Sequence, residues 1–150
     1  TKCIPLWNGP GTVKVIITDS NGAPAGPDLI QQVQEYIAPT SDQGEGKAPI
    51  GASVTVEAPE AVAVDINVTL FYQPGYDPVA VKTNLETALA SYINGLGIGE
   101  TVRYAAIGKI IFETEGVSDY SGLLINGGTG NIVVPENGKA ILGMVTFNDG

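Results

Sequence analysis

The sequence contains no histidine and a single cysteine, Cys3. A chain without histidine cannot by itself form a Ser-His-Asp or Cys-His catalytic arrangement or a histidine-ligated zinc site. A single cysteine cannot form an intrachain disulfide, and it offers no thiolate cluster for a metal. We therefore expect no catalytic, metal or cofactor site, and a chain that is made in a reducing cytoplasm.

Charge is also scarce, because charged residues make up 15% of the 150 residues against about 25% in a typical soluble domain. The net charge of −9 arises from sixteen scattered acidic residues. The seven basic residues lie far apart in the sequence: Lys2, Lys14, Lys47, Lys82, Arg103, Lys109 and Lys139. Phosphate binding depends on clustered lysine and arginine, so we expect no nucleic-acid partner.

Long apolar runs are missing too, although the mean hydropathy is +0.16. No run approaches the roughly 18 residues of a membrane span, so we expect no membrane insertion. The apolar surplus must then lie in a core or in contacts with other chains. The first residue, Thr1, is not methionine, and no signal-peptide pattern follows it. We expect a fragment of a longer protein, cut from its N-terminal side.

The stretch WNGPGTVKVII, residues 7–17, resembles a phosphate-binding loop at first sight. Such a loop needs the spacing G-x-x-x-x-G-K-[ST] between a strand and a helix, and neither the spacing nor a following helix is present here. Asn8-Gly9-Pro10-Gly11 is instead typical of a turn between paired strands. The stretch therefore predicts a hairpin between residues 2–7 and 12–18.

The rest of the first third predicts one helix and one strand. Pro27-Asp28 opens an amphipathic helix that ends at Pro39, with an apolar face formed by Leu29, Ile30, Val33, Tyr36 and Ile37. Residues 40–49 are polar and glycine-rich, which is typical of a mobile loop or linker. Residues 51–59 predict a strand.

Regular alternation over residues 61–72 predicts a long, half-buried strand. One face carries Val62, Val64, Ile66, Val68, Leu70 and Tyr72. The other carries Asp65, Asn67 and Thr69, which we expect to face solvent or a partner.

Two further helices and a β-rich tail follow. Asp77 as N-cap and Pro78 at the first helical position open a helix that ends at Gly95. The isoleucine spacing in residues 103–113 favours a short helix, although Gly108 weakens it. In the tail, the turn sequences NGGTG and PENGK separate short strands.

These elements predict an α+β fold with helices on one face of mostly antiparallel sheets. Ala58-Pro59-Glu60 is the expected boundary between two subdomains, residues 1–59 and 60–150. The first two predicted helices share an apolar pattern at a constant offset, and residues 50–56 resemble 98–104. This similarity raises the alternative of a strand-helix-strand pseudo-repeat, although chance similarity of two amphipathic helices is the simpler explanation.

Other chemical patterns are weak. Asp19-Ser20-Asn21-Gly22 lacks the later oxygen ligands of a calcium loop, and residues 126–131 lack the spacing of a dinucleotide fingerprint. Two carboxylate pairs have a spacing compatible with acid–base catalysis, Glu57 with Glu60 and Glu113 with Glu115. An aromatic sugar-binding platform could be formed by Trp7, Tyr72, Tyr76, Tyr104 and Tyr120. A solvated acidic edge and scattered packing are the simpler explanations.

Four stretches carry a resemblance to a known family: WNGPGTVKVIITD, PDLIQQVQEYI, APIGASVTVEAPEAVAVDINVTLFY, and GVSDYSGLLINGG with NIVVPENGKAILGMVTF. In this order they resemble the C-terminal part of the baseplate J-like family, the wedge proteins of contractile phage tails, of Mu-like phages and of prophages. The resemblance implies a structural protein that pairs with itself and with a smaller wedge partner around the hub, oligomeric in the full-length assembly. It implies no catalytic residue and no cofactor, and it assigns no interface residues.

The leading hypothesis is therefore a component of a phage or prophage tail baseplate, made in the bacterial host cytoplasm, that acts in assembly and in the rearrangement triggering sheath contraction. Two alternatives remain open at this point. One is a carbohydrate-binding or adhesin module that uses Tyr76 or Tyr120. The other is a carboxylate-based cell-wall hydrolase that uses Glu113.

Overall fold

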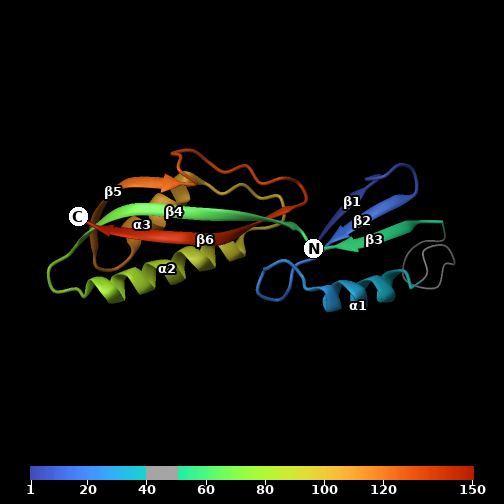
Figure 1. Ribbon diagram of the computed structural model, residues 1–150, viewed down its shortest axis with the longest axis horizontal. Coiled ribbons are helices and arrows are strands. Elements are labelled where there is room, and N and C mark those ends of the chain that lie inside the picture. The colour runs from blue at the N-terminus through green and yellow to red at the C-terminus, as the bar shows by residue number, and fades with distance from the viewer. Residues whose placement is uncertain (40–50) are drawn as a thin grey trace.

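The computed structural model describes residues 1–39 and 51–150. Within these residues it contains two three-stranded sheets and three helices, which confirms the predicted α+β class. The sheets lie end to end along the long axis of an elongated molecule (Figure 1). The loop predicted at residues 40–49 lies outside the described residues.

The first sheet has the strand order β1-β2-β3. Strands β1 (Lys2–Pro5) and β2 (Thr12–Ile16) pair antiparallel, so the predicted hairpin is confirmed. Lys14 projects from β2 and forms a 2.8 Å ion pair with Glu57 of β3 (Ser53–Glu57). Its position within a strand is unlike that of a phosphate-binding lysine.

Helix α1 (Pro27–Ile37) connects β2 to β3, and these two strands are parallel. Its apolar side packs on a small core. The core consists of Val15, Ile17, Ala25, Ala38, Val54 and Val56. The Gln34 side chain pairs with the backbone of β3. Its Nε2 donates to the Val54 carbonyl at 3.0 Å, and its Oε1 accepts from the Val56 N–H at 2.8 Å. Tyr36, expected on the apolar face, is 67% exposed.

The second sheet has the strand order β5-β4-β6. Its central strand is β4 (Glu60–Tyr72), flanked by β5 (Val117–Ile125) and β6 (Gly138–Asp149). The alternation predicted for residues 61–72 is confirmed. The fully buried positions of β4 are Val64, Ile66, Val68 and Leu70.

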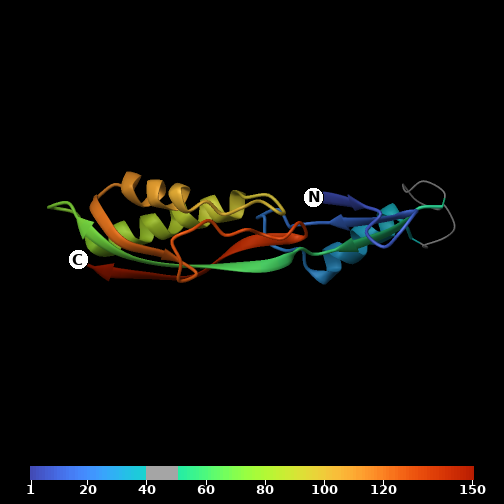
Figure 2. The same ribbon diagram turned by 90° about the horizontal axis from the view of Figure 1, so that it is seen from above.

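Two helices cover one face of this sheet, α2 (Pro78–Gly95) and α3 (Tyr104–Glu113), and both lie on the same side in Figure 2. The predicted N-cap of α2 is confirmed, because the Val79 N–H donates to Asp77 Oδ1 at 3.1 Å. Gly108 makes room in α3 for a tyrosine, since a Cβ there would lie 2.5 Å from the Tyr120 hydroxyl. A glycine that weakens the helix locally is thus required by packing.

Lys139 of β6 is 1% exposed, a burial that no local pattern in the sequence indicated. Its ammonium group donates to the carbonyls of Ile93 at 3.1 Å, Asn94 at 3.0 Å and Leu96. These carbonyls lie at the C-terminal end of α2, where backbone acceptors lack helical partners and a cation is favourable. Burial lowers the pKa of Lys139 below its ordinary value.

The expectation of mostly antiparallel sheets is wrong, because each sheet contains one antiparallel and one parallel pair. Strands β2 and β3 are parallel because α1 intervenes as a crossover connection. In the second sheet, α2 and α3 connect β4 to its antiparallel neighbour β5, and β6 then pairs with the other edge of β4, parallel to it. Residues 98–104 also form no return strand, since Val102 makes only an isolated bridge to Ile132 and α3 begins at Tyr104. The second strand-helix-strand unit of the predicted pseudo-repeat therefore lacks its return strand.

The expectation of short strands in the tail is also wrong, because β5 and β6 span 9 and 12 residues.

Candidate functional site

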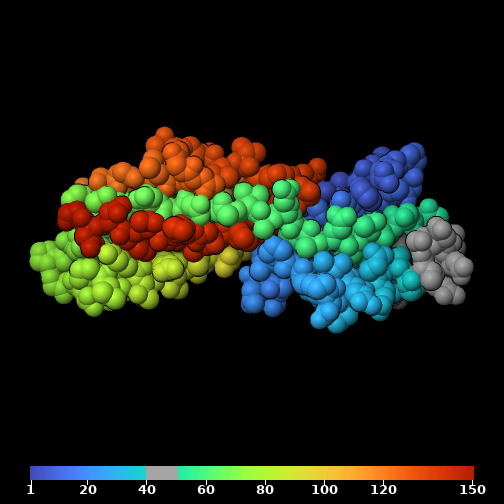
Figure 3. Space-filling view, in the orientation of Figure 1, coloured from blue at the N-terminus to red at the C-terminus, as the bar shows by residue number. Residues whose placement is uncertain are grey.

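The second sheet has one uncovered face, opposite α2 and α3. Figure 3 shows this face, with β4 and β6 running side by side and no helix over them. The side chains of β4 on this face are exposed, and they alternate with the buried ones. They include Asp65 and Asn67, for which we predicted contact with solvent or a partner.

A bulge in β6 shapes the middle of the open face. Val64 pairs with Leu142 and Ile66 pairs with Val145, so that Gly143 and Met144 both lie opposite Asp65. Two residues opposite one is the signature of a β-bulge. A Cβ at Gly143 would collide with the Asp65 carboxylate, which explains the glycine.

Asp65 and Asn126 hold the strands on either side of this bulge. Asp65 Oδ1 accepts a 2.7 Å hydrogen bond from the Met144 N–H. Asn126, just after β5, accepts from the Asp65 N–H at 2.7 Å and donates to the Ala63 carbonyl at 3.1 Å. Its φ of +49° is a conformation that asparagine tolerates better than most residues. Hydrogen bonds between side chains and backbone therefore hold β4 to its neighbours on both sides of Asp65.

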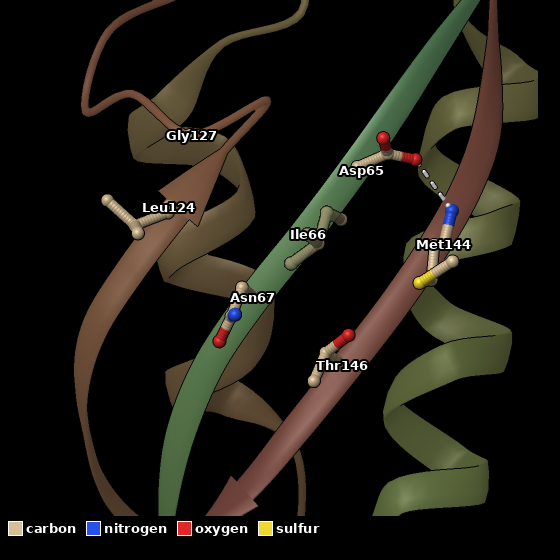
Figure 4. Close-up of a pocket in the computed structure, with 7 residues that line it drawn as sticks. All are labelled: Asp65, Ile66, Asn67, Leu124, Gly127, Met144 and Thr146. Atoms are coloured by element: carbon tan, nitrogen blue, oxygen red, sulfur yellow. Dashed lines mark hydrogen bonds between the residues drawn. The ribbon is translucent and has the colours of Figure 1, made fainter.

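The hollow has a volume of about 210 Å³ and lies between β5 and β6 across β4 (Figure 4). Its lining consists of Asp65, Ile66, Asn67, Leu124, Gly127, Met144 and Thr146. Met144 is 73% exposed and Leu124 is 37% exposed. Asp65 is the one charged residue in this lining, and its carboxylate already accepts from Met144.

This set of groups favours packing against another surface over chemistry. Acid–base catalysis needs a proton donor and acceptor placed together, and the lining contains a single titratable group. Exposed apolar side chains beside uncharged polar ones are typical of protein contacts, whose centres are poor in charge. Among the residues that the structure describes, no group of three or more His, Cys, Asp or Glu could hold a metal ion.

The carboxylates singled out from the sequence lie elsewhere. Glu57 is paired with Lys14, and Glu113 lies 3.8 Å from Lys109 one helical turn away. Glu115 accepts a 3.0 Å hydrogen bond from the Tyr76 hydroxyl, which contributes to a raised pKa of Tyr76. None of these groups lines the hollow.

The five aromatic residues that the sequence analysis considered for a sugar-binding platform are distributed over separate elements and form no common platform. Tyr72, Tyr104 and Tyr120 pack against the core of the second sheet. Trp7 and Tyr76 are 40% and 41% exposed, in the first hairpin and just before α2. The structure therefore gives the sugar-binding alternative no geometric support.

Two family models match the chain. The model of the baseplate J-like protein C-terminal domain matches residues 64–148, and that of the baseplate J-like central domain matches residues 1–58. The chain belongs to the baseplate J-like family. This membership confirms the resemblance found in the sequence.

Two relatives of this baseplate J-like chain come from Bacillus subtilis (strain 168). The phage-like element PBSX protein XkdT is 39% identical over 145 residues, which cover 96% of the chain and 42% of the relative. The uncharacterized protein YqbT is 38% identical over 147 residues, which cover 97% of the chain and 42% of that protein. The chain thus spans about two fifths of the length of the curated relatives it matches.

The hollow of this baseplate J-like chain was only partly predictable from the sequence. Alternation in β4 correctly placed Asp65 and Asn67 on its exposed face. Met144 was missed because a bulge changes which residues of β6 face outward and no local pattern marks it. Leu124 was missed because its place beside Asn67 depends on the pairing of β5 with β4, which joins segments far apart in sequence. No described helix has the length and apolar character needed to cross a membrane.

Proposed function

We propose that this chain is a structural, non-catalytic part of the baseplate of a phage or prophage contractile tail. The observation that carries the proposal is the match of baseplate J-like central and C-terminal domains across the chain. The name of the relative XkdT, a phage-like element protein, supports the same setting. The site residues support it chemically, because they are suited to contacts and offer no pair of catalytic groups.

Within that role, the chain acts as a wedge component. It pairs with itself, with a smaller wedge protein and with the hub, and it takes part in the rearrangement that triggers sheath contraction. It is synthesised in the host cytoplasm and ends in the tail baseplate. The open face of the second sheet is the surface through which it contacts a neighbouring baseplate protein.

The two sheets correspond to two subdomains, residues 1–59 and 60–150. Support comes from the separate hydrophobic clusters, one under each sheet. Ala58 and Pro59 link β3 to β4. A short link of this kind lets each sheet keep its own core.

The experiment replaces Met144 by arginine in the full-length gene of the phage or prophage. Arginine there places a charge over the hollow, and buried unpaired charge is costly in an interface. The matched control is Val79→Arg on α2, because Val79 is 70% exposed and Met144 is 73% exposed. Induced particles are purified and examined by electron microscopy.

We expect Met144→Arg to reduce the yield of tails with complete baseplates at least tenfold, and Val79→Arg to leave it unchanged. Normal tail yield with Met144→Arg rules out the open sheet face as the contact. If deletion of the whole gene leaves intact, contractile tails, the structural role itself is wrong.

A further inference from the structure

The two sheets are joined by a short link, residues 58–59, between the end of β3 and the start of β4. On one side of the link, the Glu57 carbonyl accepts a 3.0 Å hydrogen bond from the Ile17 N–H, within the first subdomain. On the other side, the Glu60 N–H donates to the Asn137 carbonyl at 2.9 Å, within the second subdomain. A change in the angle between the subdomains must therefore be absorbed by the dihedral angles of residues 58–59, as in a hinge.

The contacts between the subdomains are small and polar. Each sheet has its own hydrophobic cluster, and the two clusters have no residue in common among those described. Lys2 of β1 reaches the second subdomain, where its ammonium group lies 3.2 Å from the Glu136 carbonyl oxygen and 3.4 Å from the Glu136 carboxylate. Both side chains are partly exposed, so this contact adds little stability. Domains that are joined by small polar contacts are expected to move relative to each other.

A turn of the first subdomain lies directly against the second. A Cβ on Gly22 would lie 2.5 Å from the Asn94 carbonyl oxygen at the end of α2, so only glycine fits there. The turn has a fixed shape, because Asp19 Oδ1 accepts hydrogen bonds from the Asn21 N–H at 2.8 Å and from the Ala23 N–H at 2.9 Å. Gly22 is thus presented to α2 by a preformed turn.

Lys139 fixes the other side of this contact. Its ammonium group donates to the Asn94 carbonyl at 3.0 Å and also to the carbonyls of Ile93 and Leu96, which holds the end of α2 in place. Its Cε would lie 4.0 Å from a Cβ on Gly22. Gly22 therefore packs on a carbonyl group that a buried lysine keeps in one position.

We propose that residues 58–59 are a hinge between the two subdomains and that the contact of Gly22 with the end of α2 is a latch. The closed latch holds the end-to-end arrangement of the sheets in Figure 1. Lys139 is a positioning residue, because it holds the Asn94 carbonyl against which Gly22 packs. When the latch opens, the first sheet changes its angle to the second while both hydrophobic clusters stay intact. The hinge is a property of the single chain, so it depends neither on a partner nor on the baseplate role.

The first test measures the distance between the subdomains in the purified chain by single-molecule fluorescence energy transfer. The labels are attached to Gln32→Cys on α1 and Glu86→Cys on α2, two exposed positions, in a Cys3→Ser background. The closed latch should give one predominant transfer efficiency. Gly22→Ala should increase a second, open population at least about tenfold, because the added methyl group overpacks against the Asn94 carbonyl.

Gly9→Ala is the matched control for backbone strain. Gly22 and Gly9 have φ values of +80° and +99°, but a Cβ on Gly9 meets no atom within 4 Å. Alanine at position 9 therefore strains the backbone of the first subdomain without blocking a contact, and we expect the wild-type distribution of distances. The proposal is overturned if Gly9→Ala opens the chain equally, or if Gly22→Ala keeps the wild-type distribution.

The second test closes the hinge covalently. A carbodiimide takes up one water as it joins Lys2 Nζ and the Glu136 carboxylate, which lie 3.4 Å apart, in an amide bond. The other described ion pairs each lie within one subdomain, so coupling there does not bridge the hinge. The coupled Gly22→Ala chain, identified by peptide mass, should return to a single distance.

The control for coupling is the double variant Lys2→Met/Gly22→Ala, which cannot form this amide. We expect it to keep both populations after the same treatment. An open population that persists in the coupled Gly22→Ala chain overturns the hinge. Met144→Arg should give the wild-type distances, because the open sheet face lies away from the link. A chain that opens with Gly22→Ala although its gene is dispensable for tails supports the hinge and contradicts only the baseplate role.

Discussion

The carboxylate of Asp65 in β4 accepts a 2.7 Å hydrogen bond from the backbone N–H of Met144 in β6. This N–H belongs to the bulged strand β6, whose regular pairing with β4 is interrupted at the position between Val64 and Ile66. A side chain therefore supplies the acceptor that the neighbouring backbone cannot. The same contact fixes the position of Met144 at the rim of the hollow.

Asp65→Ala should destabilise the chain by about 1–2 kcal/mol, because it leaves the Met144 N–H without its charged acceptor. Asp65→Asn keeps an oxygen at the same place and should lose less. Urea unfolding followed by circular dichroism measures both changes. Equal stability of Asp65→Ala and the wild type would show that solvent replaces the carboxylate without cost.

Gly143→Ala should be destabilising by about 1–3 kcal/mol, because the added methyl group overpacks against the Asp65 carboxylate. The control is Gly130→Ala, where a Cβ meets no atom within 4 Å, and we expect almost no change. The double variant Asp65→Ala/Gly143→Ala should lose less stability than the sum of the two single variants, since both substitutions affect one contact. Strict additivity would contradict the steric explanation.

Lys139→Met should destabilise the chain by roughly 2–4 kcal/mol, the range expected when buried acceptors lose a charged donor. Three carbonyl groups at the end of α2 would lose the ammonium donor. Lys109→Met, on an exposed face of α3, is the matched control, and we expect a change below about 0.5 kcal/mol there. Hydrogen exchange should show faster opening at the C-terminal end of α2 in Lys139→Met. A fully stable variant would mean that water satisfies these carbonyls.

Asp149 provides a pH-dependent contribution to stability. Hydrogen bonds from Lys82 and Tyr72, each 2.7 Å, lower the pKa of the Asp149 carboxyl below its ordinary value of 3.8. The folded state then favours the ionised form, so this stabilisation is complete above the ordinary pKa and is lost as pH falls through the lowered one. Carboxyl NMR titration should show the Asp149 pKa rising toward 3.8 in Lys82→Met. No movement would contradict the assigned cause.

Residues 60–150 should fold without residues 1–59, because their hydrophobic cluster is complete within the second subdomain. Two interactions that tie the subdomains together are the 3.4 Å ion pair between Lys2 and Glu136, whose exposure makes it weak, and the packing of Gly22 on Asn94. The isolated segment gives up both at little cost to its own core. We expect cooperative urea unfolding and a native near-ultraviolet spectrum from this segment alone. A segment that is unfolded or aggregates would contradict the boundary at Pro59.

Local sequence signals predicted the elements whose pattern is complete within a few residues. The Gly-Pro-Gly turn predicted the first hairpin, strict alternation predicted β4, and Asp77 with Pro78 predicted the start of α2. The absence of histidine means that this chain supplies no histidine of its own to a catalytic or metal site. Among the residues that line the hollow, Asp65 and Asn67 were correctly predicted to lie on the exposed face of β4.

Tertiary structure alone decided which strands became neighbours and in which direction. Periodicity determines which face of a strand is apolar, because it depends on backbone geometry within that strand. The parallel partner of β4 is β6, which follows β5 in the chain but pairs with the opposite edge of β4. The bulge at Gly143 lies against Asp65, which is far away in sequence. Lys139 is likewise buried only because the end of α2 offers it three carbonyls. The sequence thus determined the elements and their apolar faces, whereas long-range packing determined the pairing, the bulge and the contact surface.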